Sequence, residues 1–139
     1  MSSNKQTIDQ RRAKQAWDDV KGVDEKHRDT LGRKYNSLAR SAPAMVQSNG
    51  LGQTLAFFRA KAGPSRSGEH GLLYNHLSQW VLSQLMVTDN NDLLDWIVQQ
   101  DTQSYRRATS ETLAYLSWLK RFAEAVLPEA DVNKDKTHG

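Results

Sequence analysis

The segment from Gln47 to Ala56, which reads QSNGLGQTLA, has the residue types of a phosphate-binding turn. Gly50 and Gly52 precede a helical pattern, and Thr54 adds a hydroxyl group near its start. Glycine-rich turns at helix N-termini bind phosphate through backbone amides. The nucleotide-binding fingerprints, however, require a preceding strand, whereas this turn follows a helical pattern and lacks both the lysine and the third glycine. The pattern therefore favours a close junction of two helices, at which Gly52→Leu is expected to damage folding or assembly.

The histidines and carboxylates lack the spacing of a catalytic or metal site. One alternative stays open, in which Glu69, His70 and His76 are the acid–base groups of a metal-independent ribonuclease. Surface or helix-edge histidines are the favoured interpretation. Asp92 and Asp101 are sufficiently explained as caps of the helices that follow them. We therefore expect no catalytic residue, no metal and no cofactor.

The basic residues are distributed unevenly along the chain. The formal net charge is +3, but residues 1–66 contain 13 Lys and Arg against 6 Asp and Glu, whereas residues 67–139 contain 6 against 10. A basic half attracts polyanions, and an acidic half offers a complementary surface to a basic neighbour or to another copy of the chain. Because no aromatic RNA-binding motif or helix-turn-helix signature is present, the basic residues predict contact with phosphate rather than recognition of bases.

Apolar residues at helical spacing predict the elements that carry these side chains. Residues 8–21 form an amphipathic helix with a basic edge of Lys14 and Lys21 and an apolar side that comprises Ala13, Ala16, Trp17 and Val20. A second pattern covers residues 24–40, although Gly32 weakens its middle. Ser41 and Pro43 then indicate a new start, followed by a short turn at 44–48.

Helical patterns continue to the end of the chain and complete the predicted fold. They cover residues 51–62, 72–87, 93–98 and 102–127, and Pro128 ends the last one. No alternating strand pattern occurs, so we predict the all-α class, as a compact single-domain bundle of five to seven helices over residues 1–139. We expect a flexible loop at 63–71 and frayed tails at 1–7 and 129–139.

Trp118 lies off the main apolar face of the last predicted helix, in line with Arg107 and Arg121. Tryptophan and arginine dominate binding hot spots, so Trp118 is a candidate partner-binding residue. Packing against another helix of the same bundle explains it equally well, because a long central helix often buries two faces. The exposure of its side chain distinguishes these interpretations.

The chain has no apolar N-terminal stretch, no run of eighteen apolar residues and no cysteine. The first two features argue against a signal peptide or a membrane-spanning helix. The third fits a reducing compartment and excludes disulfides and cysteine nucleophiles. We therefore expect a cytoplasmic protein without membrane contact.

Two segments resemble the characteristic blocks of a known family, the small subunit of the type III-B CRISPR effector, or Cmr complex. They are SAPAMVQSNGLGQTLAFFRAK at 41–61 and SYRRATSETLAYLSWLKRFAEAVL at 104–127. RRAKQAW at 11–17 and LLDWIVQQD at 93–101 also resemble that family. The resemblance covers most of residues 11–127 and excludes the loop at 63–71 and the tail after Pro128.

The resemblance implies a small all-α protein without a nuclease activity of its own. It implies partners within the Cmr complex: the repeated backbone subunit, further copies of the small subunit stacked head to tail, and paired guide RNA and target RNA. It does not fix which residues contact RNA, so these are inferred from the basic positions. The expected RNA-binding residues are Arg11, Arg12, Lys14, Lys21, Lys61, Arg106, Arg107, Lys120 and Arg121.

A second hypothesis from another class remains. A free-standing helical adaptor could bind only protein, through Trp118 and the acidic C-terminal half, without RNA binding. Salt-dependent binding of single-stranded RNA would argue against this hypothesis.

Overall fold

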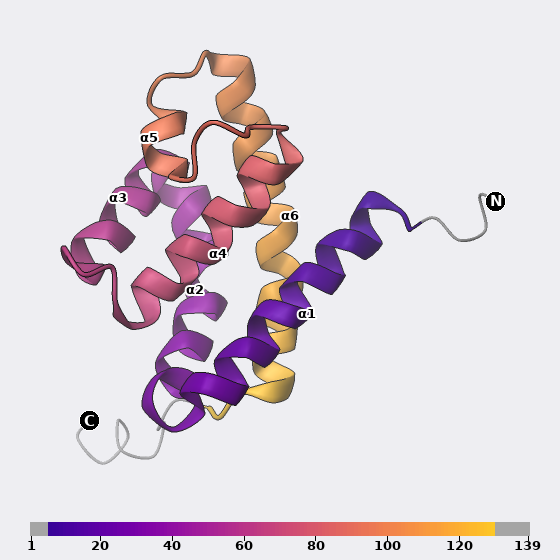
Figure 1. The fold of residues 1–139 in the computed structure, drawn as a ribbon, viewed down its shortest axis with the longest axis vertical. Coiled ribbons are helices and arrows are strands. Elements are labelled where there is room, and N and C mark those ends of the chain that lie inside the picture. Colours follow the sequence, from indigo (N-terminus) through magenta and orange to yellow (C-terminus); the bar gives the residue numbers. More distant parts are fainter. Residues whose placement is uncertain (1–5, 130–139) are drawn as a thin grey trace.

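The computed structural model describes residues 6–129. The regular secondary structure of this part consists of helices alone, joined by short loops. Most of the two predicted frayed tails lies outside the described residues. Six α-helices and one π-helical turn occur within them (Figure 1), and their bounds are α1 (Ile8–His27), η2 (Arg28–Gly32), α2 (Arg33–Asn49), α3 (Leu51–Ala62), α4 (Gly68–Gln84), α5 (Leu93–Ile97) and α6 (Thr102–Val126). The predicted all-α, compact helical bundle is confirmed.

The long helix α6 is the centre of the packing. It contacts α1, α2, α4 and α5, while α3 packs mainly on α4 and α2. Figure 1 shows α1 crossing the lower, C-terminal half of α6 obliquely, and both helices run in the same general direction. The core between these helices is built from aliphatic and aromatic side chains, of which the largest buried ones include Tyr35, Leu55, Phe58, Leu73, Tyr74, Leu77, Tyr115, Leu116 and Leu119.

Helix α1 begins with a capping box. The Thr7 hydroxyl accepts a hydrogen bond from the Gln10 amide, and the Gln10 side chain accepts one from the Thr7 amide. These two bonds satisfy backbone donors that the first turn leaves without partners. They fix the start of α1 at Ile8, directly after the cap residue Thr7.

The predicted new start at Ser41 and Pro43 is wrong, because α2 continues through Pro43 to Asn49. Proline removes one backbone hydrogen bond from a helix interior. The helix persists because its apolar stripe stays buried on both sides of the proline, at Leu38, Ala39, Ala42 and Val46. Tertiary packing therefore outweighs the local preference for a break.

The first two predicted helices also join differently from the expectation. Helix α1 continues to His27, and the π-helical turn η2 connects it to α2 without a loop. Gly32 lies in that turn and is buried, and a Cβ atom there would lie 3.2 Å from the Pro128 ring. This glycine therefore makes room for the chain end that follows α6 rather than weakening a helix.

The carboxyl end of α6 is held by side chains from η2 and α2. Arg28 donates to the Val126 carbonyl at 3.1 Å, and Arg33 donates to the Glu129 carbonyl at 2.7 Å. Asn36, which is fully buried, donates to the Pro128 carbonyl at 3.1 Å. Helix ends leave such carbonyls without intrahelical partners, so these bonds fix how α6 meets the first helices.

Helix α4 starts at Gly68, inside the segment predicted as a loop, and it ends at Gln84 instead of residue 87. Gly71 explains the early start. A Cβ atom at this position would lie 2.2 Å from the Arg66 carbonyl oxygen, so only glycine lets the first turn of α4 pack against residues 63–67. Arg66 itself has φ = 55°.

Candidate nucleic-acid interface

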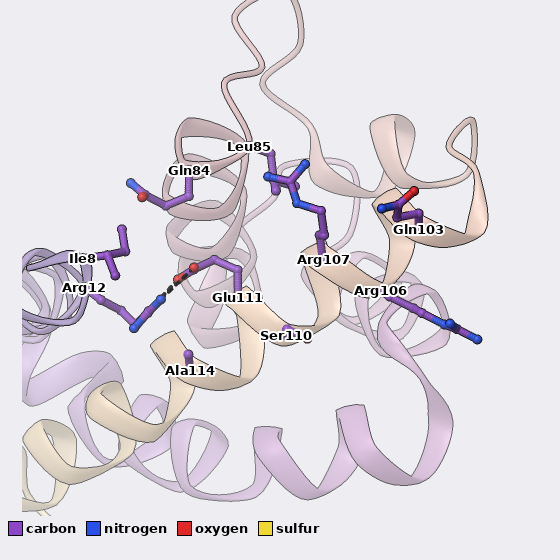
Figure 2. Close-up of a pocket in the computed structure, with 10 residues that line it drawn as sticks. All are labelled: Ile8, Arg12, Gln84, Leu85, Gln103, Arg106, Arg107, Ser110, Glu111 and Ala114. Atoms are coloured by element: carbon purple, nitrogen blue, oxygen red, sulfur yellow. Dashed lines mark hydrogen bonds and ion pairs between the residues drawn. The ribbon is translucent and has the colours of Figure 1, made fainter.

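A groove of about 590 Å³ lies between the start of α1, the end of α4 and the first half of α6. Figure 2 shows that it brings together three predicted RNA-binding residues, Arg12, Arg106 and Arg107. Arg107 points toward the groove near Leu85, whereas Arg106 points away from it. Both side chains are exposed, and neither has an ion-pair partner among residues 6–129. They are free to contact an external anion.

Arg12 has a different role, because two carboxylates already bind it. Its guanidinium donates to Glu111 at 2.6 and 2.9 Å and to Asp9 at 2.7 Å, and its side chain is 13% exposed. The hydrogen bond to Glu111 and the neighbouring carboxylate charges raise the pKa of Arg12 further, so its charge is permanent. Trp80 also donates to Glu111, at 2.8 Å. Arg12 therefore fixes α1 onto α6 and α4, and its RNA contact stays a prediction.

The remaining predicted residues lie outside the groove. Lys14 pairs with Asp18 at 2.6 Å on the exposed side of α1, and Lys21 lies 5.9 Å from the centre of the Trp17 ring. Lys61 lies 5.8 Å from the Phe57 ring on α3. The others are exposed or half-buried on α1 and α6, namely Arg11, Lys120 and Arg121.

Trp17 departs from the expectation for the apolar side of α1. Its side chain is 39% exposed, whereas Ala16 and Val20 beside it are fully buried. The Phe122 ring meets it edge to face at 5.1 Å between centroids. Trp17 is thus anchored on α6 but remains in contact with solvent.

Trp118 packs within the bundle. Its ring stacks on Phe122 at 5.6 Å, and its indole nitrogen donates to Asp9 at 3.0 Å. This hydrogen bond, together with the hydrogen bond from Arg12 and the Arg12 charge, lowers the pKa of Asp9. These contacts support the interpretation of Trp118 as an intramolecular residue, and its partner binding stays a prediction.

The glycine turn has the geometry of a helix junction. Gly50 has φ = 87° and ψ = 159°, a backbone conformation essentially restricted to glycine, and connects α2 to α3. The Gly52 amide, which a phosphate would need, instead donates to the Tyr105 hydroxyl at 2.9 Å. A Cβ atom on Gly52 would lie 3.4 Å from this hydroxyl, so a small side chain fits there. A side chain is therefore less well tolerated at Gly50 than at Gly52.

The two histidines of the ribonuclease alternative have separate environments. His70 packs against Phe57 and Phe58 and lies 3.5 Å from Glu69. His76 instead bonds the Tyr35 hydroxyl at 2.7 Å. Burial lowers the pKa of both histidines. Because their partners differ, the structure does not assemble them into one acid–base pair.

A buried polar cluster around Asp19 joins all four long helices. Asp19 accepts hydrogen bonds from Gln15 at 3.0 Å and from the Tyr115 hydroxyl, and it lies 3.9 Å from His76. Tyr35 on α2 completes the cluster through His76. Burial raises the pKa of Asp19, although His76 and the hydrogen bonds oppose this. Sequence reasoning missed this cluster, because its members come from helices far apart in the chain.

Asp92 and Asp101 are confirmed as helix caps. Asp92 accepts from the Asp95 amide at the start of α5, and Asp101 accepts from the Ser104 amide at the start of α6. Asp92 also pairs with Arg59 at 3.1 Å and Arg66 at 3.4 Å, a role that its sequence context did not reveal.

The fold and surface define a class of protein: a small all-α bundle with exposed basic side chains beside one groove and along the outside of α1. In the described part of the chain no cluster of histidine and carboxylate groups is suited to hold a metal ion. Likewise, none of the helices between residues 6 and 129 has the length and hydropathy of a membrane span.

Comparison with known proteins identifies the family. The model of the CRISPR-associated protein family Cmr5 matches residues 8–126. The CRISPR system Cmr subunit Cmr5 of Thermus thermophilus is 32% identical over 96 residues, which cover 69% of this chain and 77% of that protein. A crystal structure of a CRISPR-associated Cmr5 family protein from the same species superposes with a TM-score of 0.70 and 28% identity, covering 89% of this chain and 100% of that one. The chain belongs to the Cmr5 family and is a small subunit of the type III-B Cmr system.

Proposed function

We propose that this protein is a non-catalytic subunit of a Cmr effector complex that contacts the phosphates of guide and target RNA. It acts in the cytoplasm, beside the repeated backbone subunit and copies of itself, in antiviral defence. The observation that carries the proposal is a pair of exposed guanidinium groups in a Cmr5 family member. Arg106 and Arg107 lie beside the groove, and neither has an ion-pair partner among the residues that the structure describes. Arginine binds phosphate well because its guanidinium donates in a planar fork.

The charge distribution in space differs from that along the sequence. Several basic residues of the first half pair with carboxylates of the second half, namely Arg12 with Glu111, Arg40 with Glu124, and Arg59 and Arg66 with Asp92. These pairs remove part of the polarity that was expected to support head-to-tail stacking. Family membership therefore supports the proposed stack more strongly than the charge pattern does.

Salt-dependent binding of single-stranded RNA tests the phosphate contacts. Each phosphate contact contributes about −0.7 to the slope of log affinity against log salt concentration. Arg106→Gln/Arg107→Gln should therefore make the slope shallower by about 1.4 and weaken binding. A matched control is Lys26→Gln/Lys34→Gln, which removes the same charge from exposed positions outside the predicted set.

Two results would contradict the proposal. If the wild-type protein shows no salt-dependent RNA binding, the adaptor hypothesis gains support. If the control double variant changes the slope as much as the arginine variant does, the attraction comes from net charge and not from this groove.

A further inference from the structure

Four side chains share the outer face of α1. Arg11, Lys14, Trp17 and Lys21 follow each other at intervals of three, three and four residues, which places them on one side of a helix. At 1.5 Å per residue, Arg11 and Lys21 are about 15 Å apart along the helix axis. We call this row the α1 ridge. It presents one aromatic ring with cations on both sides.

The ring of Trp17 packs edge to face against Phe122, and the residue is partly exposed to solvent. Phe122 contacts it at 5.1 Å with an interplanar angle of 83°, and Phe122 is itself stacked on Trp118. Lys21 lies 5.9 Å from the centre of the ring, one turn further along α1. Trp17 is 39% exposed, so part of it remains accessible to a ligand, and the Lys21 ammonium lies over its ring.

The charges beside Trp17 favour a nucleic acid over a protein as its partner. Lys14 is paired with Asp18, but Arg11 and Lys21 have no carboxylate within ion-pair distance among residues 6–129. Protein interfaces are depleted in lysine, whereas sites for single-stranded nucleic acid combine aromatic rings with basic side chains that follow the backbone.

We propose that Trp17 is a stacking platform for one base of single-stranded RNA, with Arg11 and Lys21 contacting the phosphates on either side. The proposal rests on the RNA contact proposed above and adds a base contact to it. Stacking tolerates any sequence, because every base has a π-face. This departs from the sequence-based expectation of phosphate contact alone.

Phe57 offers a matched comparison on another helix. It is 42% exposed, and Lys61 lies 5.8 Å from its ring, so the aromatic–lysine pair resembles that of Trp17 and Lys21. One turn earlier, however, the chain has Gln53 and Thr54 instead of a cation. Phe57→Leu therefore removes an exposed ring of similar setting without disturbing the α1 ridge.

The test measures binding of the full chain to a uridine oligomer and to an abasic ribose–phosphate oligomer of equal length. Trp17→Leu should weaken binding of the uridine oligomer by about 5- to 150-fold and leave the abasic oligomer and the salt slope unchanged. Trp17→Phe, which keeps a ring, should retain most of the affinity, and Phe57→Leu should bind like the wild type. Thermal unfolding checks that each variant folds.

Tryptophan fluorescence gives a second readout that does not depend on a leucine variant. The uridine oligomer, but not the abasic one, should quench the wild-type emission, and Trp17→Phe should remove the quenched component.

Three outcomes would overturn the proposal. Equal binding of both oligomers, without an effect of Trp17→Leu, removes base stacking but leaves the phosphate contacts standing. Binding of neither oligomer contradicts both proposals. Loss of co-purification with other Cmr subunits in Trp17→Leu, with unchanged affinity for uridine RNA, would make Trp17 a protein contact.

Discussion

Gly50 and Gly52 lie two residues apart, but their backbones have different requirements. Gly50 has φ = 87°, whereas Gly52 is inside α3 with room for a methyl group 3.4 Å from the Tyr105 hydroxyl. We expect Gly50→Ala to lower the free energy of unfolding by about 1–3 kcal/mol. Gly52→Ala should change it by less than about 1 kcal/mol, because alanine also favours the helix. Denaturant unfolding of both variants measures this difference, and equal losses would contradict it.

His76 should make stability depend on pH. Burial lowers its pKa from the ordinary 6.5, so the unfolded chain takes up this proton at a higher pH than the folded chain does. The stability that neutral His76 contributes is present above pH 6.5 and is lost as the pH falls from there through the lowered folded value. Asp19 has the opposite effect on the pH dependence of stability. Its pKa is raised in the folded chain, so the stability that protonated Asp19 contributes is lost as the pH rises through this raised pKa.

The measurement is chemical unfolding at about pH 7.5 and about pH 5.5, on either side of the ordinary histidine pKa. The wild type should lose stability on acidification, and His76→Gln should lose less, although the lowered pKa of His70 contributes in the same sense in both proteins. Asn75→Gln, an exposed change on the same helix, is the control. An identical loss in wild type and His76→Gln would show that the buried cluster is not linked to this proton.

At the scale of elements, the pairing of Arg12 with Glu111 docks the start of α1 onto α6. Both side chains are 13% exposed. Glu111→Gln should cost about 2 kcal/mol by weakening two charge-assisted hydrogen bonds. Lys14→Gln breaks an ion pair whose side chains are 62% and 49% exposed, and it should cost less than about 0.5 kcal/mol. Amide hydrogen exchange should show faster opening of α1 in Glu111→Gln only, and comparable exchange in both variants would contradict this role.

The connection between α3 and α4 depends on a glycine in the first turn of α4. Gly71→Ala should lower the free energy of unfolding by about 2 kcal/mol or more, because its methyl group would overlap the Arg66 carbonyl. In α1, apart from the adjacent residues and the backbone of the helix itself, nothing lies within 4 Å of the position that a methyl group would take at Gly22, so Gly22→Ala should stabilise by up to about 1 kcal/mol. Thermal unfolding compares the two alanine variants. A neutral Gly71→Ala would show that residues 63–67 can move aside.

The helices could be predicted from the sequence because their apolar stripes recur at helical spacing. The α2 helix shows where such reasoning fails. Pro43 and Ser41 carry a local signal for a break, but four buried residues on one face keep the helix continuous. Two glycines were misread in the same way. Gly32 suggested a weak helix, but it lies against the Pro128 ring; Gly71 suggested a loop, but it lies against the Arg66 carbonyl in the first turn of α4.

At the scale of the whole molecule, the candidate interface was only partly predictable. Basic residues are visible in the sequence, but their partners are not: Arg12 and Glu111 are 99 positions apart. The structure is needed to distinguish the Arg12 guanidinium, which holds helices together, from those of Arg106 and Arg107, which are exposed and have no ion-pair partner within residues 6–129. The exposure of Trp17 could not be predicted from the sequence either, because its helical spacing matches that of Ala16 and Val20, which are buried.

The central claim is that this subunit contacts RNA within the Cmr complex through its outward basic residues. Nuclease protection of guide and target RNA tests it most directly, in complexes assembled with the wild type, with Arg106→Gln/Arg107→Gln, or without the subunit. We expect omission to shorten or weaken the protected region, and the arginine variant to weaken protection while still assembling. Unchanged protection in all three complexes would contradict the claim.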